Sequence, residues 1–349
     1  MKPLVSILIP AYNAETTIAE TLQSALAQTW PQKEIIVVND GSIDGTEKIA
    51  LSFGPKVKVI STANRGLSAA INTGLGFCNG DYIQELDSDD LLVADKIERQ
   101  LSALRPGESK RIVLSSPWAW FFYRTRGARF VSNSLCQDLS PVEWMLRKLG
   151  ENLHMQNATW LVSRELVEAA GPWNTDLHYD QDGEYFARVL LASEGTRFVS
   201  GPAVFYRLSG MNRVSYIGRS QKKRDSLLVS MKLQIKYLRS LEESDRVREA
   251  CVKYLQNWYS ELYPVRPDIL AELDVLAAGL QGKLEIPRLR RKYSWIKYVL
   301  GWGAANWAQK VLPAVKASLT REYDKTMLKL ESWGLSASAS YPMNLTEKE

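Results

Sequence analysis

Carboxylate side chains follow one short apolar stretch of the chain, where residues 82–86 (YIQEL) lead directly into Asp87, Asp89 and Asp90. Carboxylates this close repel one another unless a cation or hydrogen-bond donors compensate them. Alternating Asp residues suit a hard divalent ion, Mg²⁺ or Mn²⁺, that also holds the phosphates of a substrate. These residues indicate metal-assisted phosphate chemistry. The structural alternative is a solvated acidic cap on a helix that starts near Leu91.

Two further loops carry polar and small residues directly after apolar runs. The first loop contains Pro10, Ala11, Tyr12 and Asn13. We expect Asn13 to cap the helix that follows. In the second loop Asp40 precedes Gly41, and a small residue there lets the backbone come close to a ligand. Asp40 would then act as an acceptor at the edge of a sheet, although either loop alone also fits an ordinary turn.

The elements around these loops are typical of an α/β domain. Short β-rich runs occur at residues 4–9, 35–38, 57–60 and 82–86, and helical patterns separate them at residues 18–26, 44–53 and 67–78. Continuously apolar strands that alternate with single helices imply a parallel sheet covered on both faces. Ligands of such sheets bind at the carboxyl ends of the strands, so the three loops should lie together.

Five phrases in this order resemble the family 2 glycosyltransferases. They are VSILIPAYN (residues 5–13), IVVNDGS (36–42), NRGLSAA (64–70), NTG (72–74) and LDSDD (86–90). The resemblance implies the GT-A fold, an open mixed, mainly parallel sheet flanked by helices.

The resemblance also implies a nucleotide-sugar site. Tyr12 would flank the base of the sugar nucleotide, and Asp40 would accept from the ring N–H of uracil or its equivalent. Asp87 would hold the ribose or the sugar, while Asp89 would bind Mg²⁺ or Mn²⁺ that bridges the diphosphate. The whole implied set is Pro10, Ala11, Tyr12, Asn13, Asp40, Arg65, Gly66, Asn72, Asp87 and Ser88, with Asp89 for the metal.

A catalytic base is implied after the turn at residues 171–174 (GPWN), where the family's usual Glu-Asp pair appears as Gln181-Asp182. Asp182 is assigned as the general base that takes the proton from the acceptor hydroxyl. A transition state with oxocarbenium character is attacked on the face opposite the departing diphosphate, which gives inversion at the anomeric carbon. Asp180 and Glu184 are the alternative bases, and a carboxylate favoured by a helix N-terminus is the structural alternative.

Two positions depart from the family's pattern. Ile71 stands where many relatives carry Arg, so a phosphate or base contact is expected from Arg65 instead. Leu208 stands where relatives often place a metal-binding His. The metal is therefore expected to be held mainly by Asp89, the diphosphate and water, with Arg207 or Arg213 as a second positive charge.

The composition bounds the class of protein. The 349 residues are 45% hydrophobic and 24% charged, which excludes disorder of the whole chain and exceeds one average domain. Only two His residues are present, so a three-His zinc site is excluded, and His154 and His178 are predicted to be structural. Three widely spaced Cys fit reduced thiols, and no run reaches the roughly 18 apolar residues of a membrane span. We expect a cytoplasmic protein.

We expect three parts: a GT-A nucleotide-sugar-binding catalytic domain (1–215), a helical domain (216–335) and a disordered tail (336–349). Residues 283–316 hold eight cations against Glu285 alone, a net charge of +7, interleaved with aromatic rings. This composition suits an anionic membrane surface, which would place the protein at the inner face of the cell membrane. A solvated helical face is an equal alternative, and no motif indicates nucleic acid.

These observations predict an inverting, metal-dependent glycosyltransferase. It would move a sugar from a nucleotide-diphosphate donor, first of all a UDP-sugar, to a hydroxyl of a glycan or lipid-linked acceptor in glycan, polysaccharide or cell-envelope synthesis. The alternatives are a nucleotide-sugar-binding module without transfer activity and a nucleotidyltransferase. The latter should need a basic triphosphate-binding loop after the first strand, and residues 10–13 contain no cation.

Overall fold

The computed structural model describes residues 2–334 except 202, 209–216, 219, 264 and 288–290. Its contacts divide the chain into two compact units: unit 1 holds Met1–Trp120 and Arg129–Pro287, and unit 2 holds Phe121–Ala128 and Arg288–Glu349. The predicted boundary at residue 215 and the predicted tail at 336–349 lie outside the described residues. The predicted helical domain, 216–335, is shared between the two units, because its first three helices have their contacts in unit 1.

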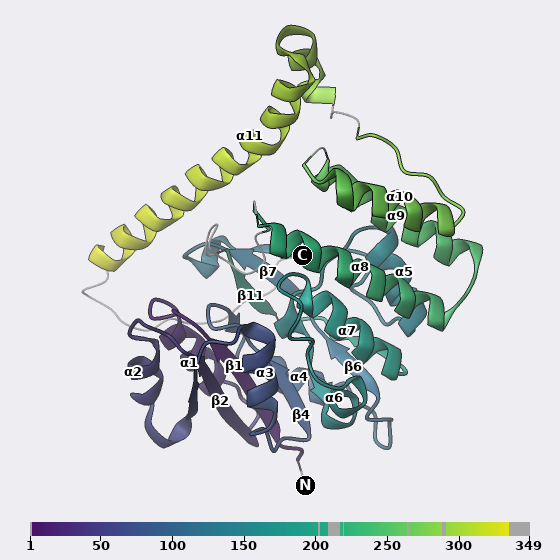
Figure 1. Ribbon diagram of the computed structural model, residues 1–349. Helices are drawn as coiled ribbons and strands as arrows, with labels where there is room; N and C mark the ends of the chain where they lie inside the picture. Colours follow the sequence, from purple (N-terminus) through teal and green to yellow (C-terminus); the bar gives the residue numbers. More distant parts are fainter. Residues whose placement is uncertain are drawn as a thin grey trace. The chain divides into compact units, whose positions relative to one another are not determined.

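Unit 1 is built on a five-stranded sheet of strand order β3-β2-β1-β4-β9. Its strands β1, β2 and β4 are labelled in Figure 1. The strands are β1 (Val5–Ala11), β2 (Lys33–Asp40), β3 (Lys58–Thr62), β4 (Tyr82–Glu85) and β9 (Val162–Ser163). The first four run parallel to their neighbours, and β9 runs antiparallel to β4. The predicted mixed, mainly parallel sheet is confirmed.

Strand register brings the chemically interesting loops to one edge of this sheet. Ala11 pairs with Asn39, so Tyr12 and Asp40 leave the sheet at the same level. Leu8 pairs with Glu85, and β4 ends there on the other side of β1. The loops after β1, β2 and β4 therefore start at the same carboxyl edge, as predicted from the order of strands and helices.

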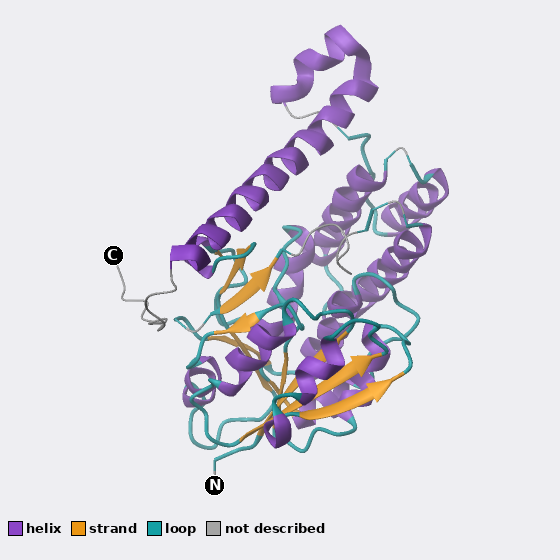
Figure 2. Cartoon of the chain, turned by 90° about the vertical axis from the view of Figure 1, so that its left-hand side faces the viewer, coloured by secondary structure: helices purple, strands orange, loops and turns teal. Residues whose placement is uncertain are grey.

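Helices surround the strands of unit 1 (Figure 2). They are α1 (Ile18–Leu26), α2 (Thr46–Leu51), α3 (Leu67–Leu75), α4 (Lys96–Ser102), α5 (Pro141–Gly150), α6 (Arg164–Ala170) and α7 (Gln181–Ala192). All seven residues of β1 are buried, which requires cover on both faces. Helix α3 comes so close to β1 and β2 that a Cβ at Gly74 would collide with Leu8 and Val38. The small residue thus sets the height of α3 above the sheet.

Short strands extend the core beyond the main sheet. They are β6 (Ile112–Ser115) with β10 (Gly195–Phe198), and β5 (Leu91–Leu92), β11 (Val204–Arg207), β7 (Trp118–Phe121) and β8 (Arg129–Val131).

A helix starting near Leu91 was the structural alternative for the acidic residues, and it is wrong. Leu91 pairs with Phe205 in a strand instead, and α4 begins only at Lys96.

Three long helices complete unit 1: α8 (Gln221–Leu241), α9 (Asp245–Leu262) and α10 (Pro267–Gly279). The apolar side chains of Leu227, Met231, Ile235 and Leu238 are buried along α8. Helix α8 packs along α7, and its side chains meet acidic residues of α7, with Tyr237 donating to Glu184 at 2.8 Å. Helix α8 therefore contacts the region that carries the predicted base.

Unit 2 contains α11 (Arg291–Gly334), which is bent where Gly301 leaves the helical conformation at φ 81° and ψ 170° (Figure 1). Unit 2 also contains Phe121–Ala128. Arg124 connects this segment to α11 by ion pairs with Asp324 at 2.7 Å and Glu331 at 2.6 Å. Apolar side chains of α11 stand open to solvent, among them Trp295 and Tyr298. Within the described part of the chain, no helix combines the length and hydropathy of a membrane span.

Candidate active site

Asn13 connects the loop after β1 to the loop after β2. Its side-chain oxygen accepts from the N–H of Ile43, and its own N–H donates to Ser42 Oγ, both at 3.0 Å. The prediction that Asn13 caps the next helix is wrong, because α1 begins at Ile18 with Thr17 as its N-cap. Tyr12, one residue earlier, is half exposed and available to a ligand at this edge.

Asp40 fixes the loop that precedes α3. It is buried, and its two carboxylate oxygens accept from the backbone N–H groups of Arg65 at 2.9 Å and Gly66 at 2.8 Å. Gly41 has φ +70°, and a Cβ there would stand 2.7 Å from the backbone N of Asn64. Only glycine allows the two loops to approach this closely. The predicted contact of Asp40 with a base stays a prediction.

Arg65 and Asn72 are both predicted to contact the ligand, and the structure gives their side chains different surroundings. The guanidinium of Arg65 is exposed and donates to Thr73 Oγ1 at 3.0 Å, so it is accessible to phosphate. The side-chain amide of Asn72 instead makes two hydrogen bonds of 2.8 Å with the backbone of Trp173. Its role toward a nucleotide sugar remains a prediction, since the amide already has a donor and an acceptor inside the protein.

The acidic loop, residues 86–90, is anchored through its last member. Asp90 is buried and accepts from the backbone N–H of Arg207 at 2.8 Å and from Gln156 Nε2 at 2.6 Å. The guanidinium of Arg207 donates to the carbonyl of Asp89 at 2.8 Å and pairs with Glu20 at 2.5 Å. Arg207 therefore brings the predicted positive charge to this loop. Arg213 lies outside the described residues.

Asp87 and Asp182 lie within electrostatic reach of each other although ninety-five positions separate them. Burial, the charge of Asp89 and the charge of Asp182 raise the pKa of Asp87 to about 7. Burial and then the charge of Asp87 raise the pKa of Glu85 to about 8, with Asp182 adding to the effect. The first turn of α7, which carries Asp182, therefore lies close enough to the acidic loop for its charge to act there. The role of Asp182 as base stays a prediction.

Hydrogen bonds distinguish Asp182 from the two alternative bases. Asp180 accepts from Ser230 Oγ at 2.7 Å and from Gln234 Nε2 at 2.6 Å. Glu184 is buried and pairs with Arg188 at 2.7 Å. Asp182 is half-buried and forms no hydrogen bond or ion pair with any residue that the structure describes. Of the three carboxylates it is the one left for a ligand.

Oxygen donors at this edge fit a hard cation only in part. Asp87, Ser88 and Asp89 are half-buried, and the repulsion between the carboxylates is the kind that a divalent ion relieves. Among the described residues, however, no group of three or more His, Cys, Asp or Glu side chains lies close enough together to hold a metal ion. A metal would need further ligands from a bound diphosphate and water, as predicted from the missing His.

The amino-terminal part of the chain is similar to a known family. Residues 6–130 match the model of glycosyl transferase family 2. A glycosyltransferase of Rickettsia typhi is 34% identical over 191 residues, which are 55% of this chain and 60% of that protein. The match thus spans less than two thirds of that relative.

Solved structures of glycosyltransferases share the fold. Staphylococcus aureus TarS 1–349 in complex with UDP-GlcNAc has a TM-score of 0.63 at 17% identity, over 79% of this chain and 81% of that chain. The mannosyltransferase PcManGT from Pyrobaculum calidifontis, in complex with GDP-Man and Mn²⁺, has a TM-score of 0.54 at 18% identity, over 93% and 88%. The predicted GT-A fold is confirmed.

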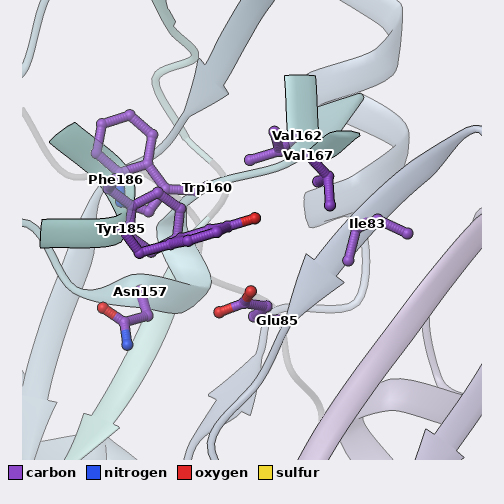
Figure 3. A pocket seen from close by; sticks show the side chains of 8 residues that line it. All are labelled: Ile83, Glu85, Asn157, Trp160, Val162, Val167, Tyr185 and Phe186. Atoms are coloured by element: carbon purple, nitrogen blue, oxygen red, sulfur yellow. The ribbon is translucent and has the colours of Figure 1, made fainter. Parts of the chain in front are cut away.

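Glu85 and Trp173 are residues of the site that the sequence did not indicate. Figure 3 shows Glu85 at a pocket that is otherwise lined mainly by apolar and aromatic side chains, with Asn157 as the other polar lining residue besides Tyr185. Asp87 and Asp182 do not line this pocket. The sequence signals for these two residues were a Glu within an apolar strand (Glu85) and a Trp after Gly-Pro (Trp173). Both patterns also fit ordinary core packing.

The raised pKa values predict how stability depends on pH. In the unfolded chain Asp and Glu release their protons near pH 4. In the folded chain Asp87 keeps its proton to about pH 7 and Glu85 to about pH 8. The folded state then binds more protons, so the free energy of unfolding of the metal-free protein should fall as pH rises through this window.

Asp87→Asn should therefore stabilise the protein more at pH 8 than at pH 5. Thermal melts in EDTA at both pH values measure the difference. Asp176→Asn is the control, because Asp176 lies on an exposed loop and should change the melting temperature equally at both pH values. An equal gain from Asp87→Asn at pH 5 and pH 8 would contradict the assignment of a raised pKa.

Proposed function

We propose that the chain is an inverting glycosyltransferase that moves a sugar from a nucleotide-diphosphate donor to a hydroxyl acceptor. The observation that carries the proposal is the position of Asp182. Its carboxylate has no partner among the described side chains and lies beside the acidic loop at the carboxyl edge of the sheet. A base facing a donor site across one reacting centre is what direct displacement at an anomeric carbon requires.

The donor would bind across the loops after β1, β2 and β4. Half-exposed Tyr12 would flank the base, with Asp40 as its acceptor, and exposed Arg65 would contact phosphate. Asp87 would hold the ribose or sugar. A UDP-sugar is the first choice, supported by the fold shared with TarS, which was solved with UDP-GlcNAc. PcManGT shares the fold and was solved with GDP-Man, so the base of the donor stays open to test.

In the reaction, Asp182 takes the proton of the acceptor hydroxyl as that oxygen attacks the anomeric carbon. The bond to the diphosphate breaks on the opposite face, which inverts the configuration. Asp89 would hold Mg²⁺ or Mn²⁺ together with the diphosphate, and such an ion neutralises the charge that develops on the leaving group. The guanidinium of Arg207 keeps the backbone of Asp89 in place for this contact.

The two alternative functions are less well supported. A module without transfer activity would have no need for an unpartnered carboxylate beside the acidic loop, yet Asp182 is one. A nucleotidyltransferase would need cations near the end of β1, and residues 10–13 provide none.

Unit 2 is proposed to bring the enzyme to an acceptor at the cytoplasmic face of a membrane, in glycan or cell-envelope synthesis. Residues 283–316 carry a net charge of +7, and Trp295 and Tyr298 are 63% and 86% exposed. Exposed rings among cations suit the interface of an anionic bilayer. A lipid-linked acceptor would give this segment its purpose.

The donor and the metal can be tested together by thermal shift. UDP-, GDP- and dTDP-sugars are screened with and without Mn²⁺, because a ligand that binds the native state alone raises the melting temperature. We expect a UDP-sugar to give a Mn²⁺-dependent shift that Asp89→Asn abolishes without unfolding the protein. If no sugar nucleotide shifts the melting temperature, the proposed function fails; an unchanged Mn²⁺ effect in Asp89→Asn would move the metal to another Asp of the loop.

Asp182→Asn should keep donor affinity and lose transfer by a factor of about 10² to 10⁴, the usual contribution of general base catalysis. Calorimetric titration of the donor and a transfer assay measure the two effects separately. Asp176→Asn serves again as the control for an exposed carboxylate. Donor affinity that falls in parallel with transfer would instead make Asp182 a structural or donor-binding residue.

Membrane binding can be tested by cosedimentation with vesicles. We expect binding to require anionic lipid and to weaken as salt rises, because each cation near such a surface contributes about 1 kcal/mol within a Debye length. Reversing the charge of Arg290, Arg291 and Lys292 should release the protein. Reversing Lys56, Lys110 and Lys236, exposed cations of unit 1, changes the net charge equally and is the control. Equal binding to neutral vesicles would refute the electrostatic attraction.

A further inference from the structure

Trp173 connects segments of unit 1 that are far apart in the sequence. Its backbone N–H donates to Asn72 Oδ1, and its backbone carbonyl accepts from Asn72 Nδ2, each at 2.8 Å. Asn72 belongs to α3, which packs on β1 and β2. The main chain of Trp173 is therefore held in place by the helix that covers the central sheet.

The side chain of Trp173 contacts residues next to both parts of the candidate active site, which are the acidic loop (residues 86–90) and the first turn of α7. Its indole N–H donates to Glu85 Oε1 at 3.2 Å, and Glu85 ends β4 two residues before Asp87. The ring stacks on Tyr185 with centroids 4.3 Å apart and an interplanar angle of 17°. Tyr185 follows Asp182 by three residues in α7, so the two lie on neighbouring turns of one helix face. Trp173 and Tyr185 are buried.

We propose that Trp173 is a positioning residue that keeps Asp182 at a fixed place relative to the acidic loop. The proposal rests on the proposed role of Asp182 as base. Like charges on Asp87 and Asp182 favour a larger separation, so a buried contact between β4 and α7 is needed to keep the two carboxylates close. A displacement of about 1 Å at such a site can reduce the rate by a factor of about 10².

Trp30 offers a matched control within the same unit. It is buried like Trp173, and its indole N–H also donates one hydrogen bond, to the carbonyl of Pro3 at 2.9 Å. Pro3 precedes β1, so this contact belongs to the amino end of the strand, away from the carboxyl edge. Trp→Phe removes the same atoms and one hydrogen bond at either position.

The first experiment compares Trp173→Phe with Trp30→Phe in the full-length chain. We expect Trp173→Phe to lower kcat by a factor of about 10 to 10² while the Kd of the donor stays unchanged, and Trp30→Phe to change neither. Glu85→Gln keeps an acceptor for the indole N–H and should lose less than Glu85→Leu. Equal losses of kcat in the two Trp variants, or a parallel loss of donor affinity in Trp173→Phe, would overturn the proposal.

Amide hydrogen exchange tests the same contact without any activity. Peptides that cover residues 85–92 and 180–190 should exchange faster in Trp173→Phe than in the wild type, and should not change in Trp30→Phe. Unchanged exchange in Trp173→Phe would refute the positioning role. A wild type without transfer would contradict the proposed function alone, since hydrogen exchange still decides on Trp173.

Discussion

Repulsion between carboxylates is the constraint on which the carboxyl edge of the sheet depends. Burial first, and then the charges of Asp89 and Asp182, raise the pKa of Asp87 to about 7. An arrangement of this kind is unfavourable on its own and becomes favourable when a cation or protons compensate the charge. The fold must therefore hold the carboxylates together before any ligand arrives.

Hydrogen bonds from backbone N–H groups provide that support. Asp40 accepts from Arg65 and Gly66, and Asp90 accepts from Arg207. Each is a bond between a carboxylate and a main-chain donor, so each fixes a loop as well as a side chain. Loops that are already ordered lose little conformational entropy when a ligand binds. The carboxylates that make these bonds are buried, which leaves the half-buried Asp87 and Asp182 for the ligand.

The sequence predicts what local pattern determines. Runs of apolar residues that alternate with helical patterns predicted the parallel strands, because burial imposes those periods. Strands β5 and β9 are two residues long and show no pattern, since only their pairing partners define them. Asn13 fits a helix cap by residue type, yet its side chain meets Ile43, a residue of another loop. The contact of Trp173 with Glu85 spans eighty-eight positions and leaves no local trace.

The three candidate bases show why the resemblance to the family could not by itself identify the carboxylate that is left for a ligand. Three carboxylates occur at the start of α7, where the helix dipole favours a negative charge, and their spacing does not rank them. Hydrogen bonds from α8 distinguish them, because Ser230 and Gln234 donate to Asp180 and Tyr237 donates to Glu184. Gly183 contributes as well, because a Cβ there would collide with the carboxylate of Asp180. Helix α8, which lies beyond the expected domain boundary, thus determines which of the three carboxylates stays available to a ligand.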